Sequence, residues 1–87
     1  MSTMLFVSNL PLSATEASLA AKFARFGTVL SAKLNPGSGT GQSRRSAFVE
    51  MKTAAEAQIA INGLNLADYD GRLISVYKAV AAAAARH

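Results

Sequence analysis

The chain of 87 residues has no cysteine, no tryptophan and only two prolines, and its charged residues make up 16% of the total. Without cysteine it forms no disulfide, zinc knuckle or iron–sulfur cluster and has no catalytic thiol. No apolar run approaches the roughly 18 residues that a transmembrane helix needs. The apolar patch at residues 4–7 lacks a basic flank and is interrupted by Ser8 and Asn9, so we expect no secretory signal and no membrane partner. We expect a cytoplasmic protein, or a nuclear one in a eukaryote.

What the sequence does have is a modest excess of positive charge, +4 at neutral pH, together with four Phe and two Tyr residues. This excess suits an anionic partner such as a nucleic acid, but many small soluble domains are equally basic. The length allows one domain with a modest core. Charge alone therefore does not decide the function, and the positions of the aromatic residues become the main question.

Alternating apolar and polar residues predict four strands, at residues 4–9, 29–34, 45–51 and 73–78. Helical spacing predicts one helix after the first strand and another after the third. With right-handed crossovers, this order gives a four-stranded antiparallel sheet with both helices on one face. The predicted fold is therefore an α+β, ferredoxin-like split βαβ sandwich. We expect a monomer with one domain over residues 1–79 and an alanine-rich tail over residues 80–87.

The ends of the helices are predicted from their capping residues. Ser13 with Glu16 fits a capping box for the first helix, and Thr15 is a competing N-cap. The second helix is expected to stop at residues 62–63, which are Asn and Gly. Residues 64–70 are then expected to form an irregular connection to the last strand.

The strand alternation places two aromatic rings on the uncovered face of the sheet. Leu5 and Val7 belong to the apolar stripe that faces the helices, so Phe6 points the other way. Phe48 points to the open face by the same argument on the third strand. The first and third strands are central neighbours in this fold, so the two rings are expected side by side. Nucleic-acid bases stack on such rings for about 1–3 kcal/mol each.

Polar and basic residues are expected around the two rings. They are Ser8, Ser31, Lys33, Arg44, Ser46, Ser75, Tyr77 and Lys78. Tyr77 either joins the open face or packs against the alanine-rich tail, and Asn9 either contacts a base or caps the strand–helix turn. Tyr69 is expected to anchor a loop. The sequence thus predicts a stacking platform with a basic rim.

Residues 5–10, LFVSNL, resemble the first-strand motif of the RNA recognition motif family, and residues 44–51, RRSAFVEM, resemble its third-strand motif. The resemblance covers about residues 4–79 and implies binding of single-stranded RNA on the open face. Arg45 and Ser46 stand where the family usually has glycine and an aromatic ring, and the loss of one stack weakens binding by about 1–3 kcal/mol. The predicted RNA-binding residues are Phe6, Ser8, Asn9, Lys33, Arg44, Arg45, Ser46, Phe48, Tyr77 and Lys78.

The sequence offers little for catalysis, and we predict no enzyme, metal or cofactor. The only histidine is the terminal His87, and the glycine-rich run at residues 37–41 lacks the Gly-Lys-Ser/Thr of a phosphate-binding loop. The alternative to RNA binding is a module that has partly lost RNA binding and holds a protein partner on its helical face. The tail at residues 80–87 is either a bystander or a helix that covers the sheet and competes with RNA.

Overall fold

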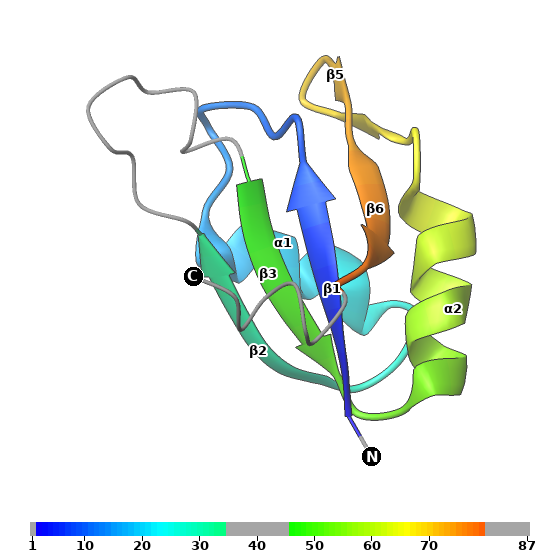
Figure 1. Cartoon of the computed structure of the whole chain (residues 1–87). Coiled ribbons are helices and arrows are strands. Elements are labelled where there is room, and N and C mark those ends of the chain that lie inside the picture. Colours follow the sequence, from blue (N-terminus) through cyan, green and yellow to red (C-terminus); the bar gives the residue numbers. More distant parts are fainter. Residues whose placement is uncertain (1, 35–45, 80–87) are drawn as a thin grey trace.

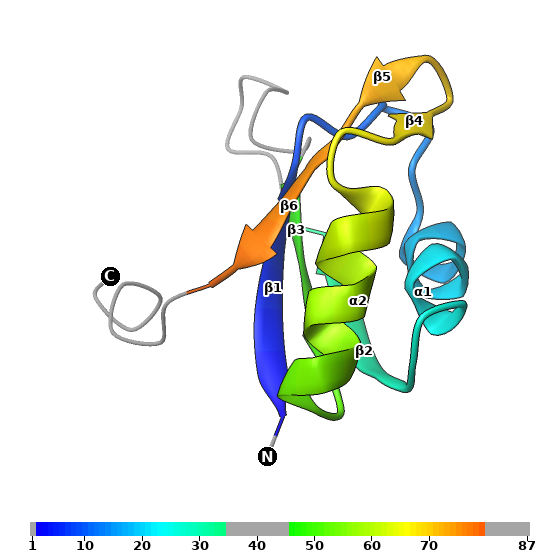
Figure 2. The same ribbon diagram turned by 90° about the vertical axis from the view of Figure 1, so that its right-hand side faces the viewer.

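The computed structural model describes residues 2–34 and 46–79, whose elements lie in the predicted order with one added hairpin (Figure 1). The elements are β1 (Thr3–Ser8), α1 (Glu16–Ala24), β2 (Val29–Leu34), β3 (Ser46–Met51), α2 (Ala54–Leu64), β4 (Asp68–Tyr69), β5 (Arg72–Leu73) and β6 (Ser75–Lys78). Four strands form one antiparallel sheet in the order β2-β3-β1-β6. Both helices lie on one side of this sheet (Figure 2), which confirms the predicted ferredoxin-like sandwich.

The core lies between the helices and the inward-facing residues of the sheet. Leu5 and Val7 of β1 are fully buried, as their alternation predicted. The other buried residues of the four-stranded sheet and the helices are Leu19, Phe23, Ala47, Val49, Met51, Ala57, Ala60, Leu64 and Val76, and Ile74 is buried just before β6. Burying a side chain of the size of leucine or phenylalanine contributes about 1.5–3 kcal/mol. Within the described ranges, neither helix is long and apolar enough to cross a bilayer.

Strand β2 departs from the predicted alternation at Leu30. Leu30 was expected on the same face as Ala32 and Leu34, but it is 52% exposed, while Val29 packs against the core instead. The pairing of β2 with β3 shifts its register between Val29 and Ser31. An extra residue in one strand turns the side chains before it to the opposite face. Leu30 is that extra residue, so the prediction for it was wrong.

Helix α1 begins at Thr15, the second of the two predicted N-caps. The Thr15 hydroxyl accepts a hydrogen bond from the backbone of Ser18 at 3.0 Å, and the Ser18 hydroxyl accepts one from the backbone of Thr15 at 3.1 Å. The predicted capping box of Ser13 and Glu16 is therefore wrong. The Ser13 hydroxyl instead donates to Asp70 at 2.8 Å.

Helix α2 continues past its predicted stop and includes Gly63. A side chain at Gly63 would overlap the ring of Phe26, because an added Cβ would lie 2.5 Å from the nearest ring carbon. This glycine therefore allows close packing of the ring against α2 and does not end the helix. The helix ends at Asn65, whose backbone N–H donates to the carbonyl of Ile61.

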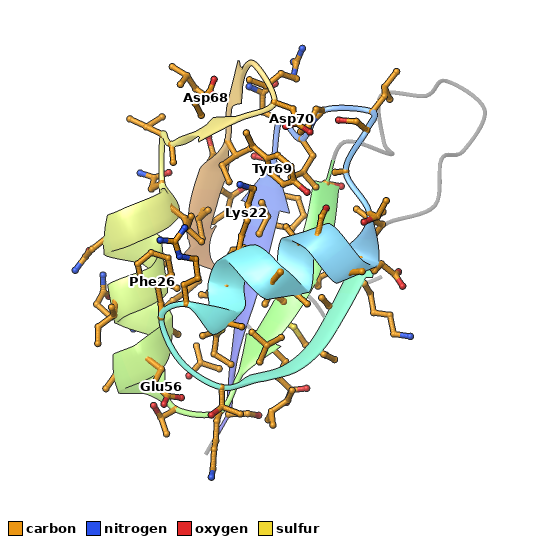
Figure 3. The ribbon with its side chains drawn as sticks, turned by 180° about the vertical axis from the view of Figure 1, so that it is seen from behind. Lys22, Phe26, Glu56, Asp68, Tyr69 and Asp70 are labelled. Carbon is orange, nitrogen blue, oxygen red and sulfur yellow. The ribbon has the colours of Figure 1, made fainter. Side chains whose placement is uncertain are left out.

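The connection after α2 contains a short hairpin that was not predicted. Strand β4 pairs antiparallel with β5, and the turn between them has a positive φ at Asp70 and at Gly71. Asp-Gly is a common pair in two-residue hairpin turns, so the signal was present in the sequence. Tyr69 is 2% exposed and its hydroxyl hydrogen-bonds to Ser18, while the Lys22 ammonium lies 4.5 Å from the centre of its ring (Figure 3). The predicted role of Tyr69 as an anchor is thus confirmed.

A side chain at the start of α1 and another at the end of α2 each accept a hydrogen bond from a backbone N–H group on an edge strand of the sheet. On β2, Glu16 accepts a hydrogen bond from the backbone N–H of Leu34 at 2.9 Å. On β6, Asn65 accepts one from the backbone N–H of Val76, also at 2.9 Å. Uncovered donors on an edge strand invite pairing with another chain. These two side chains therefore oppose edge-to-edge association.

Candidate nucleic-acid interface

One row of side chains crosses the open face of the sheet from edge to edge. In the strand register, Phe6 lies opposite Phe48 of β3 on one side and opposite Tyr77 of β6 on the other. Phe48 in turn lies opposite Lys33 of β2. Residues directly opposite each other in neighbouring strands point to the same face. We call these four residues, Lys33, Phe48, Phe6 and Tyr77, the aromatic row.

The ring of Phe6 contacts the rings of both Phe48 and Tyr77. The ring centres of Phe6 and Phe48 are 5.2 Å apart in an edge-to-face arrangement, and those of Phe6 and Tyr77 are 5.4 Å apart at a tilt of 49°. Aromatic pairs of this geometry contribute about 0.5–1.5 kcal/mol beyond the effect of the area that they bury. Tyr77 remains 50% exposed, and both phenylalanines are half-buried. The ring of Tyr77 therefore lies on the open face, which was one of its two predicted positions.

Serine side chains form a second row beside the aromatic row. Ser8 lies opposite Ser46 of β3 and opposite Ser75 of β6. All three are half-buried. Because the same-face residues of a strand are two positions apart, the Cα atom of each serine is about 7 Å from the Cα atom of the aromatic residue on its own strand. Hydroxyl groups that donate and accept hydrogen bonds are therefore within reach of a base or ribose placed on the rings.

A third row, on the other side of the aromatic row, contains Glu50. Glu50 lies opposite Met4 of β1 and Ser31 of β2. The Ser2 hydroxyl donates to its Oε2 atom at 2.5 Å, and the Ser31 hydroxyl lies 3.5 Å from its Oε1 atom. The alternation of the third strand predicts Glu50 on this face, but sequence reasoning gave it no role.

Asn9 is held by hydrogen bonds within the protein. Its φ angle is +62°, its side-chain amide donates to the carbonyl of Leu73 at 2.7 Å, and its Oδ1 atom accepts from the Arg72 guanidinium. These contacts tie the end of β1 to β5 and favour the turn-capping alternative that the sequence left open. A contact of Asn9 with RNA stays a prediction.

The predicted basic rim is only partly described. Lys33 is exposed at the β2 end of the aromatic row. Lys78 lies opposite the buried Leu5, so its side chain leaves the outer strand on the helical side and must bend around the sheet edge to reach the open face. Arg44 and Arg45 lie outside the described residues. Their contacts, like that of Lys78, remain predictions.

The chain belongs to the RNA recognition motif family, since the family model matches residues 5–75. It is 41% identical over 75 residues to the RNA-binding protein RbpA of Nostoc sp.. The match covers 86% of this chain and 74% of that protein.

Two solved structures have a similar fold. The first is RNA Binding Protein PG1, which superposes with a TM-score of 0.81 at 32% identity, covering 90% of this chain and 94% of that chain. The other is the second RRM domain of the yeast poly(U)-binding protein Pub1, with a TM-score of 0.78 and 28% identity. This match covers 90% of this chain and 94% of that chain. The sequence resemblance to this family is thereby confirmed.

Proposed function

We propose that the protein binds single-stranded RNA on the open face of its sheet, with bases stacked on Phe6 and Phe48. The aromatic row is the observation that carries this proposal, because it places Phe6 in contact with two other rings on the face of the sheet that lies opposite α1 and α2. Membership of the RNA recognition motif family supports RNA as the partner.

Tyr77 is the third stacking residue in this proposal. Ser46 offers no ring on β3, but Tyr77 supplies one on β6, beside Phe6. We infer that successive bases cross the sheet along the aromatic row. Ser8 and Ser46 then contact riboses or base edges from the neighbouring row, and Asn9 remains a candidate contact at the end of β1.

The phosphate contacts in this proposal come from Lys33, Lys78, Arg44 and Arg45. If each neutralises one phosphate, the slope of log Kobs against log salt concentration is about −3 for a single strand. We therefore expect modest affinity and a shallow salt dependence, with stacking as the larger contribution.

Titration of the isotope-labelled protein with a short single-stranded RNA, followed by NMR, tests the proposal. The amide signals of β1, β3 and β6 are expected to shift together. Phe6→Ala and Phe48→Ala should each weaken binding by at least about fivefold, since each removes a stack of about 1–3 kcal/mol. Leu30→Ala, which removes an exposed apolar side chain outside the aromatic row, is the matched control and should leave affinity unchanged.

Other shift patterns would contradict RNA binding on this face. Shifts confined to α1 and β2 would instead favour an apolar groove between these elements, lined in part by Ala17, Ala21 and Leu30. That groove is where the protein-interaction alternative would place its partner on the helical side. Unchanged affinity in a folded Phe6→Ala, Phe48→Ala double variant would also exclude stacking as the mechanism.

A further inference from the structure

Glu50 is an acidic residue on the open face of the sheet, in the row beside the aromatic row. The residue is half-buried, and its carboxylate accepts hydrogen bonds from the hydroxyls of Ser2 at 2.5 Å and Ser31 at 3.5 Å. A negative charge at this place repels phosphate, so it does not serve the general attraction of RNA. It is, however, well placed to contact the edge of a base.

The fixed carboxylate has hydrogen-bonding capacity to spare. An ionised carboxylate only accepts hydrogen bonds and has about four lone-pair positions, two on each oxygen. Among the described residues, Ser2 occupies one position on Oε2 and Ser31 one on Oε1. The side chains of residues 2–34 and 46–79 thus leave one position on each oxygen for a pair of donors from a bound base.

A base stacked on Phe48 reaches this carboxylate. Glu50 and Phe48 are two residues apart on β3 and share the open face, which puts their Cα atoms about 7 Å apart. A purine or pyrimidine lying flat on the ring extends several ångströms beyond it, and its Watson–Crick edge is free in a single strand. This step rests on the proposed stacking of RNA on the aromatic row.

Guanine fits two adjacent carboxylate acceptors better than the other bases do. Its Watson–Crick edge presents two neighbouring donors, N1–H and the N2 amino group. Adenine and cytosine present an amino group next to an acceptor nitrogen, and uracil presents one N–H between two carbonyl oxygens. Each of these sets an acceptor lone pair against the carboxylate. We propose that Glu50 makes guanine the preferred base on Phe48.

The test compares five single-stranded pentamers that differ only in the central base. They are rUUGUU, rUUIUU, rUUAUU, rUUCUU and rUUUUU, where I is inosine, which lacks only the N2 amino group of guanosine. We expect the wild-type protein to bind rUUGUU about tenfold more tightly than rUUUUU, and rUUIUU to lose most of this gain. The inosine comparison needs no variant and therefore does not depend on how a substitution folds.

Glu50→Gln then assigns the preference to this side chain. Glutamine keeps one acceptor for a serine hydroxyl but cannot accept from two guanine donors. The preference for rUUGUU over rUUUUU should therefore fall below about twofold. Asp68→Asn is the matched control, because it also removes one negative charge, but from β4, outside the four-stranded sheet. This variant should keep the preference for guanine.

The possible results separate this inference from the proposed function. Binding of all five pentamers with equal affinity, a preference for uridine, or an unchanged preference in Glu50→Gln would each overturn the role of Glu50 while leaving RNA binding intact. Failure of the wild-type protein to bind any pentamer would instead overturn the proposed function.

Discussion

Replacing Ser46 with phenylalanine should strengthen RNA binding. Ser46 lies on the open face opposite Ser8 and two residues from Phe48, at the position where the family usually carries an aromatic ring. A ring placed there lies about 7 Å along β3 from Phe48. It would add a stacking surface next to the aromatic row without changing the strand register.

The size of the effect follows from one added stack. A base on an aromatic ring contributes about 1–3 kcal/mol, so affinity should rise by about five- to 150-fold, and about tenfold is a reasonable central value. Ser46 is half-buried on an inner strand, and a cross-strand side-chain pair contributes about 0.2–1 kcal/mol relative to a pair of alanines, so we expect the variant to keep the fold.

The assay is fluorescence anisotropy with a labelled single-stranded RNA, together with urea unfolding to verify the fold. Ala21→Phe is the matched control, since it adds the same ring at an exposed position of α1, on the other side of the molecule. The reasoning is refuted if Ser46→Phe folds normally and binds RNA no more tightly than the wild-type protein. An equal gain from Ala21→Phe would show that added apolar surface alone accounts for it.

Two further predictions concern the fold. Gly27→Ala should destabilise the protein by about 1–3 kcal/mol in urea unfolding, because an added Cβ would lie 2.6 Å from the Cβ of Glu56; a stability equal to that of the wild type would contradict the packing. Replacing Glu16 and Asn65 together with alanine should free a backbone donor on each edge strand and produce concentration-dependent association in sedimentation velocity. A double variant that stays monomeric at every concentration would show that these side chains are not needed to keep the edges apart.

Residue alternation was enough to predict which side chains face the core and which face outward. Leu5 and Val7 are large and aliphatic, and a period of two leaves Phe6 no other face. The prediction failed at Leu30, where an extra residue in β2 interrupts the alternation. A bulge of this kind depends on pairing with β3 and leaves no local pattern in the sequence.

The glycine at position 63 was a misleading local signal. Gly63 was expected to end α2, because glycine commonly follows the last turn of a helix. Its actual role depends on Phe26, which comes from a segment far away in the sequence and occupies the space that a side chain would fill. Only the packing of the two segments distinguishes a helix stop from a close contact.

The strand register changes how the missing ring at Ser46 is interpreted. Along β3 alone, the chain lacks one aromatic residue of the family's third-strand motif, which predicts weak RNA binding. Across the sheet, however, Tyr77 lies opposite Phe6 and contacts its ring, so Phe6 still lies between two other rings, those of Phe48 and Tyr77. Which strand carries the third ring decides the direction of a bound chain, because bases follow the rings. The departure at Ser46 therefore redirects the proposed RNA path toward β6 rather than simply shortening it.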